Sequence, residues 1–191
     1  MDVIECICTR RSVRKFMDKP ISSETINNLV ELATKAPTAS NGQPWGFVLI
    51  DDTSVIDRLS EMVRADLLVQ IENFPYLQRY ERWFHNPDFH FFYHAPNLIL
   101  IYGNSKSHFY IHDCSMAAQN IMLAAQSMGI GSCWIGFAQF TLNSESFKER
   151  YSVPQEYDLV STLALGYKKD HLITYGNRKE PVVFNQKSDA I

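Results

Sequence analysis

The chain has 191 residues and a formal charge of −3, and 46% of its residues are hydrophobic. A chain of this length can bury an ordinary core without disulfide or metal staples, so we expect a single domain over residues 1–191. The charge balance and the lack of a long basic run argue against a general nucleic-acid binder, which would present a strongly basic face. There is no C-x-x-C pair, no secretory leader pattern and no apolar run long enough for a bilayer, so we expect reduced thiols, a cytoplasmic location and no membrane partner.

Apolar periodicity and capping residues predict a mixed α and β chain without repeats. In chain order, the predicted elements are a helix over 2–9, a helix capped by Ser22 or Ser23 and stopped by Pro37, a strand over 46–50, a helix over 55–71, a strand over 97–102, a helix over 110–128 closed by Gly129, a strand over 132–136, a helix over 144–151 and a strand over 159–167. The helix over 110–128 has small and apolar residues on more than one face, so we expect it to be buried all round.

Residues 74–94 interrupt this alternation and hold much of the aromatic content of the chain. Their apolar positions repeat with a period of neither 2 nor 3.6. Two interpretations stay open: a satellite hydrophobic cluster under an irregular excursion, and a lid that faces a substrate.

Two polar clusters flank the helix that ends at Pro37. The first, over residues 10–16, carries four cations within six residues, and guanidinium groups bind phosphate oxygens in a bidentate manner. The second, over residues 36–45, offers Asn and Gln amides that suit the heteroatom edge of a flavin or pterin. Together they predict a site for a phosphorylated, planar cofactor.

Other common chemistries lack their motifs. There is no phosphate-binding P-loop, no G-x-S-x-G and no H-E-x-x-H. The segment 129–134 starts like a dinucleotide-binding fingerprint, but Trp134 stands where the third glycine is needed and the segment follows a helix. His108 and His112 have helical spacing but no neighbouring glutamate or obvious third ligand, so we expect no metal site there.

The sequence R-R-S-V-R-K-F, followed by A-P-T-A-S-N-G-Q-P-W, resembles the signature of the nitroreductase family of flavoproteins. Similarity continues through residues 113–136, 163–167 and 178–183, and therefore covers nearly the whole chain. The resemblance implies an α+β sandwich with a central mixed, mainly antiparallel sheet flanked by helices. It also implies an intertwined homodimer built on the helix over 110–128, with non-covalent FMN at the interface.

The resemblance further implies a role for each matching position. The FMN phosphate, ribityl chain and pyrimidine edge would be bound by Arg10, Arg11, Ser12 and Arg14, with Arg178 or Lys179 completing the phosphate pocket. The ring would be lined, from the partner subunit, by Pro37, Thr38, Ala39, Asn41 and Gln43. Near its reactive edge would lie Trp134, Ile135 and Gly136, with backbone N–H groups of Ile135 and Gly136 stabilising charge. No catalytic acid or base is implied.

Such enzymes reduce their flavin with NADH or NADPH and then reduce a nitroaromatic, a quinone or a related acceptor in a ping-pong cycle. Two alternatives stay open. One is a specialised relative that consumes a flavin or dehalogenates an aromatic substrate, and the other is a protein that stores or senses FMN without efficient turnover.

Overall fold

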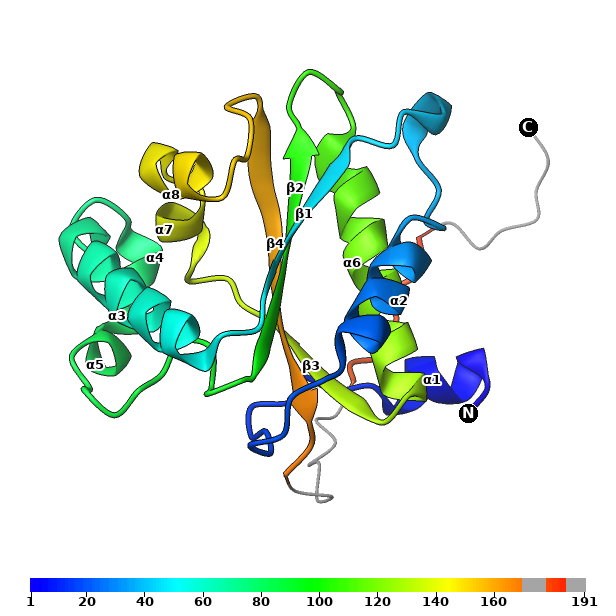
Figure 1. Ribbon diagram of the computed structural model, residues 1–191, viewed down its shortest axis with the longest axis horizontal. Helices are drawn as coiled ribbons and strands as arrows, with labels where there is room; N and C mark the ends of the chain where they lie inside the picture. The colour runs from blue at the N-terminus through cyan, green and yellow to red at the C-terminus, as the bar shows by residue number, and fades with distance from the viewer. Residues whose placement is uncertain (170–177, 185–191) are drawn as a thin grey trace.

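The computed structural model describes residues 1–169 and 178–184 (Figure 1). Its centre is a four-stranded antiparallel sheet in the order β1-β2-β4-β3. The strands are β1 (Trp45–Ile50), β2 (Asn97–Asn104), β3 (Ile130–Trp134) and β4 (Tyr157–Tyr167). Within the described ranges, a single parallel bridge, Ser12 to Ser132, adds to this antiparallel pairing.

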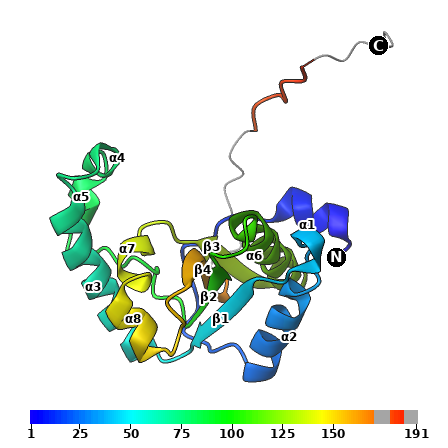
Figure 2. The same cartoon turned by 90° about the horizontal axis from the view of Figure 1, so that it is seen from above.

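Helices cover both faces of the sheet, which gives three layers (Figure 2). One layer contains α2 (Ser23–Ala33) and α6 (Tyr110–Ser127), with α1 (Val3–Thr9) packed on α6. The opposite layer contains α3 (Thr53–Gln70), α4 (Pro75–Gln78), α5 (Glu81–Phe84), α7 (Gln139–Leu142) and α8 (Glu145–Arg150). The predicted α+β sandwich is confirmed. Among the described residues, no helix is both long and apolar enough to cross a membrane.

The alternation of side chains along β2 builds a separate core on each face. Leu98, Leu100 and Tyr102 pack toward α3, whereas Ile99 and Ile101 pack toward α2 and α6. All five side chains are at most 1% exposed, because β2 is an inner strand with a helical layer on each side. The continuous apolar sequence of this strand is typical of such burial.

One face of α6 remains exposed, so the expectation that this helix is buried all round is wrong for the single chain. Ile111 is 52% exposed and Met116 is 38% exposed, whereas Cys114, Ala117 and Ala118 are fully buried. The small residues, with Ile121 and Met122, pack on the sheet and on α2, whereas Ile111 and Met116 face outward.

Residues 10–17, here called the strap, run along the sheet between α1 and α2. The N–H of Val13 donates to the Ser132 carbonyl at 2.9 Å, and the N–H of Met17 donates to the Tyr167 carbonyl at 2.8 Å. This close approach depends on Gly131, because a Cβ at that position would lie 2.9 Å from the side chain of Val13.

Replacing Gly131 with alanine is therefore expected to lower the free energy of unfolding by about 1–3 kcal/mol, the usual cost of overpacking. Urea denaturation measures the change. Gly46→Ala is the matched control, since its Cβ would meet Tyr157 at an ordinary 3.4 Å. Equal losses in the two variants would show that the strap does not pack against β3 as described.

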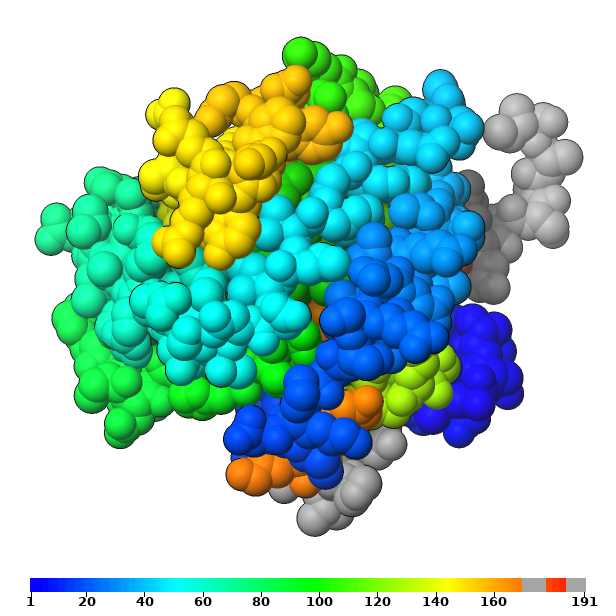
Figure 3. Space-filling model, viewed as in Figure 1, coloured from blue at the N-terminus to red at the C-terminus, as the bar shows by residue number. Residues whose placement is uncertain are grey.

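The aromatic excursion over 74–94 is largely part of the core. Leu77, Phe84, Phe91 and Phe92 are at most 2% exposed and belong to the cluster under α3. These residues therefore do not form a separate satellite cluster, because they share one cluster with Leu98 and Leu100 of the sheet. In the space-filling view, the teal and green residues of this region form one flank of the molecule, away from α1 and α2 (Figure 3).

Arg64 of α3 fixes the path of this excursion. Its Nη1 donates to the carbonyls of Phe84 at 3.0 Å and Asn86 at 2.6 Å, and its Nη2 donates to those of Pro87 at 3.3 Å and Phe89 at 2.7 Å. The side chain is only 13% exposed. One guanidinium group therefore supplies hydrogen bonds to four backbone carbonyls between residues 84 and 89, in addition to the backbone bonds within the excursion.

Candidate functional site

The cationic end of the strap gathers around the thiol of Cys133 in β3. Arg10 comes directly after α1, where its N–H donates to the Cys6 carbonyl at 2.9 Å. The Ser12 side chain hydrogen-bonds to Cys133, and the charges of Arg10 and Arg14 act on the same thiol. Burial raises the pKa of Cys133 despite these neighbours, so the thiol is neutral and does not serve as their counterion.

Electrostatic repulsion among the guanidinium groups indicates an anion site. The pKa of Arg10 is lowered, first by burial and then by the positive charges of Arg178 and Arg11. Neither Arg10 nor Arg14 pairs with a carboxylate in the described part of the chain. A bound phosphate would relieve this repulsion and supply the missing acceptor.

Arg14 is oriented by a residue that the sequence analysis missed. Its Nε donates to the Tyr93 hydroxyl at 3.2 Å, and its guanidinium carbon lies 5.7 Å from the centre of the Tyr93 ring. Burial alone would lower the pKa of Arg14, but the hydrogen bond to Tyr93 and the smaller charge effects of Cys133 and Tyr93 together outweigh burial, and the pKa is raised. No hydrogen bond of its two Nη atoms is found among the described residues, so both can donate to a ligand.

Arg11 and the C-terminal cations differ in their placement. Arg11 Nη1 turns back to the carbonyls of Cys8 at 2.8 Å and Arg10 at 2.7 Å, and so covers the end of α1. Arg178 is exposed but close enough to Arg10 to affect its pKa. Lys179 is also exposed.

The second polar cluster is a strained loop over residues 37–43, here called the amide loop. Ser40, Asn41 and Gln43 have φ values of 51°, 54° and 44°, a region that non-glycine residues rarely occupy. The Gln43 side chain donates to Asn41 Oδ1 at 3.2 Å, and the N–H of Ala39 donates to buried Asp113 at 3.2 Å. Asp113 thus fixes the loop to α6.

Within one chain, the strap and the amide loop lie at opposite ends of α6 (Figure 1). Asp113 in the first turn of α6 holds the loop, whereas Gln126 in the last turn donates to Thr9 beside Arg10 at 3.1 Å. Gln126 follows Asp113 by thirteen positions, which corresponds to about 20 Å at 1.5 Å per residue. A single chain therefore does not bring the two predicted clusters together.

The segment after β3 differs from the expectation in one respect. The Ile135 N–H already donates to the Thr162 carbonyl at 2.8 Å, so it is not available to a ligand. Gly136 is exposed, and a Cβ there would meet no atom within 4 Å. Trp134 is 38% exposed beside it.

Gly136 opens onto an apolar pocket of about 300 Å³. Its other lining residues are Leu67, Tyr76, Leu77, Tyr80, Phe137 and Phe140. Tyr80 and Phe137 contact edge to face, with ring centres 5.0 Å apart. The part of the excursion that does not fill the core thus contributes to an aromatic pocket.

The antiparallel sheet between two helical layers defines an α+β protein, and Arg10 and Arg14, which pair with no carboxylate in the described residues, mark a candidate site for an anionic ligand. The sequence matches the model of the nitroreductase family over residues 7–167, most of the chain. The chain therefore belongs to the nitroreductase family, as its motifs predict.

Known relatives agree with this assignment. A protein from Archaeoglobus fulgidus named "Putative NADH dehydrogenase/NAD(P)H nitroreductase" is 30% identical over 174 residues, which cover 88% of this chain and 87% of that protein. A 4-nitrobenzoate reductase from Pseudomonas putida is 25% identical, with 86% and 85% covered. A solved nitroreductase with bound FMN from Bacteroides fragilis is 27% identical, with a TM-score of 0.79 over 100% of this chain and 99% of that chain.

Proposed function

We propose that this chain is an FMN-dependent oxidoreductase that takes electrons from NADH or NADPH and passes them to a nitroaromatic, a quinone or a related acceptor. The observation that carries the proposal is the pair Arg10 and Arg14 beside Cys133: neither guanidinium group has a carboxylate partner in the described residues, and Arg10 is repelled by Arg178 and Arg11. The names of the relatives support a nicotinamide donor and FMN.

The donors of the strap fit the phosphorylated end of FMN. Arg10 and Arg14 supply charge-assisted hydrogen bonds, the Ser12 hydroxyl can supply another, and Arg178 adds positive charge. FMN, when bound, supplies the hydride and electron transfer chemistry that no side chain of this site can provide. Gly136 leaves room for a flat ring to approach the backbone, and its N–H has no acceptor in the described residues.

A homodimer would complete the site, because a second copy can bring its amide loop to the strap of the first. The exposed apolar face of α6 fits such an interface. The outward apolar residues of α1, of α6 and of the residue that precedes α6 are Val3, Ile4, Ile7, Phe109, Ile111 and Met116. Residues 178–184 stand away from the body (Figure 2), and Val182, Val183 and Phe184 are 62–88% exposed. Both surfaces are suited to burial by a second chain.

The pocket beside Gly136 fits the acceptor in this proposal. Aromatic walls exclude water and bind flat apolar rings, which favours aromatic acceptors over small polar ones. Its position next to the exposed Gly136 would place an acceptor near the cofactor ring.

The test is a visible absorption spectrum of the purified protein, repeated without oxygen after NADPH and then NADH is added. We expect a flavin spectrum that either nucleotide bleaches and that 4-nitrobenzoate or a quinone restores. A bound flavin that neither nucleotide reduces would contradict the proposal and favour storage or sensing. A protein that neither contains nor takes up FMN would overturn the site.

A further inference from the structure

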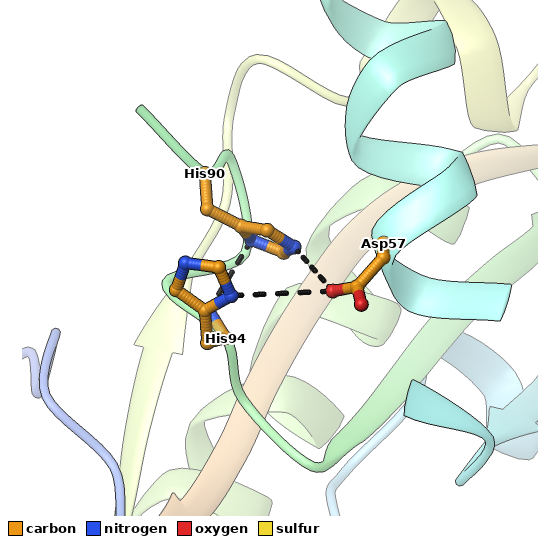
Figure 4. Close-up of side chains that lie close together, drawn as sticks. All are labelled: Asp57, His90 and His94. Carbon is orange, nitrogen blue, oxygen red and sulfur yellow. Dashed lines mark hydrogen bonds and ion pairs between the residues drawn. The ribbon is translucent and has the colours of Figure 1, made fainter. Parts of the chain in front are cut away.

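Asp57, His90 and His94 lie together between the start of α3 and the end of the excursion (Figure 4). His90 Nε2 is 3.0 Å from Asp57 Oδ1, and His94 Nδ1 is 4.0 Å from the same oxygen. The two imidazole rings have centres 4.1 Å apart. Two imidazoles and a carboxylate are side chains that ligate metals, so the first question is whether this group is a metal site.

The hydrogen bonds of His90 argue against metal binding. Its Nδ1 accepts the N–H of Phe92 at 3.1 Å and the N–H of His94 at 3.2 Å. Nδ1 is therefore the unprotonated nitrogen, and Nε2 carries the proton and donates it to Asp57. A histidine that ligates through Nε2 has its proton on Nδ1, which then donates to an acceptor. The arrangement here is the reverse.

The two bonds to His90 Nδ1 instead hold a tight turn over residues 90–95, here called the His90 turn. Tyr93 and His94 both have positive φ, at 56° and 52°. Such a backbone persists only when the surrounding structure holds it, because each residue costs about 1–3 kcal/mol. The N–H of Tyr93 bonds to the His90 carbonyl and that of Ala95 to the Phe92 carbonyl, both at 3.0 Å, which completes the turn.

The His90 turn presents Tyr93 to the strap. The Tyr93 hydroxyl accepts the Nε–H of Arg14 at 3.2 Å, and its ring lies beneath the guanidinium carbon at 5.7 Å. A continuous set of contacts thus leads from Asp57 through His90 and Tyr93 to Arg14.

We propose that neutral His90 is a positioning residue for the cofactor site: it holds the turn that sets Tyr93 against Arg14, and its protonation releases that contact. This inference rests on the proposed function, since Arg14 matters through the ligand that it binds. Tyr93 is then a further residue of the site, and the excursion acts on the cofactor through it.

The charges around His90 give the direction of the pH dependence. Burial and the neighbouring His94 lower the pKa of His90, while Asp57 and Glu61 on α3 act to raise it. The net direction is down from an ordinary value of 6.5. The stabilisation of the turn is therefore complete above that ordinary pKa and is lost as the pH falls through the lower value in the folded chain. A proton on Nδ1 of His90 would point at the two N–H groups that donate to this nitrogen, and Nδ1 could no longer accept them.

The first experiment uses the chain without FMN. Nitrogen-15 NMR of the imidazole rings reports the tautomer of His90 and its titration between pH 8 and 5. We expect Nε2–H at neutral pH and a shift of the Arg14 Nε–H signal that follows the titration of His90. An Nδ1–H tautomer at neutral pH would overturn the inference, and so would uptake of Zn²⁺ that shifts both ring signals at one equivalent.

The second experiment measures the FMN dissociation constant by flavin fluorescence over the same pH range. A hydrogen bond to a charged group is worth enough that we expect binding to weaken about tenfold at acid pH in the unmodified protein. His90→Asn should keep tight binding without the pH dependence, because Asn Oδ1 can accept the two N–H groups at every pH. His90→Ala and Tyr93→Phe should bind about tenfold more weakly at neutral pH.

His85→Asn is the matched control, because His85 is an exposed histidine of the same excursion whose ring lies 3.7 Å from Glu81 and makes no other ion pair within residues 1–169 and 178–184. It should keep the affinity and the pH profile of the unmodified protein. FMN binding that is unchanged in Tyr93→Phe and His90→Ala would overturn the inference while leaving the proposed function intact. If the unmodified protein binds no FMN, the proposed function fails, whereas the ring tautomer and the Arg14 signal still decide whether His90 holds the turn.

Discussion

Replacing both Arg10 and Arg14 with alanine is expected to weaken FMN binding by a factor of about 10² to 10⁴. Each charge-assisted hydrogen bond contributes about 1.5–3 kcal/mol, and the double variant loses at least one from each residue. The protein without FMN should fold as well as the unmodified one, because Arg10 is repelled by Arg11 and Arg178 in the absence of an anion. Flavin content after purification and fluorescence titration measure the binding, and thermal unfolding measures the stability.

The control variant removes two positive charges from a different part of the protein surface. Arg58 on α3 and Arg150 on α8 are exposed, and Arg58 makes one described hydrogen bond, to Ser54 Oγ at 3.3 Å. The variant Arg58→Ala/Arg150→Ala should keep FMN. Full flavin content in the Arg10 and Arg14 variant, or equal loss in both double variants, would contradict the placement of the phosphate on the strap.

The second large effect is a loss of stability, and it is expected when Arg64 is replaced. Arg64→Met keeps much of the volume of the side chain but removes the guanidinium donor from the carbonyls of residues 84, 86, 87 and 89, of which that of Asn86 keeps the N–H of Phe89. We expect the free energy of unfolding to fall by about 2–4 kcal/mol, because unsatisfied polar groups and a lost network are costly. Urea denaturation gives the total, and hydrogen exchange should show the loss concentrated in the excursion.

Arg58→Met is the comparison for this prediction, since it removes an exposed arginine from the same helix. It should change stability by no more than about 0.5 kcal/mol. A similar small effect for Arg64→Met would mean that the excursion is held by its buried aromatic rings rather than by the guanidinium group.

The regular part of the fold could be predicted because its signals are local. The N-cap interactions of Asp2, Ser22 and Ser144 mark helix starts that the side chains confirm, and the apolar run of β2 needs no partner to be recognised. The strand predicted over 132–136 begins and ends two residues earlier, at Ile130 and Trp134. Gly129 has a positive φ of 75°, which turns the chain directly after α6, and β3 therefore starts at the next residue.

The rest depends on contacts between distant residues. The helices α4, α5 and α7 have four residues each, too few to leave a period in the sequence. Arg64 and Tyr93 act on segments 20 and 79 residues away in the chain, and neither belongs to a motif. The polar clusters were predicted as one site, but their separation along α6 follows only from tertiary contacts.

The position of the strap links the proposed cofactor binding to protection against aggregation. β3 is an outer strand of the sheet, and its free side is paired in part by the strap through Val13 and Ser132. An uncovered strand edge is a template for pairing with another chain. The segment that carries Arg10 and Arg14 therefore also shields this edge. A substitution that detaches the strap is expected to lower both the solubility of the protein and its flavin content. A colourless variant that precipitates has therefore lost the cover of the β3 edge, whereas a colourless variant that stays in solution has lost only its contacts with the flavin.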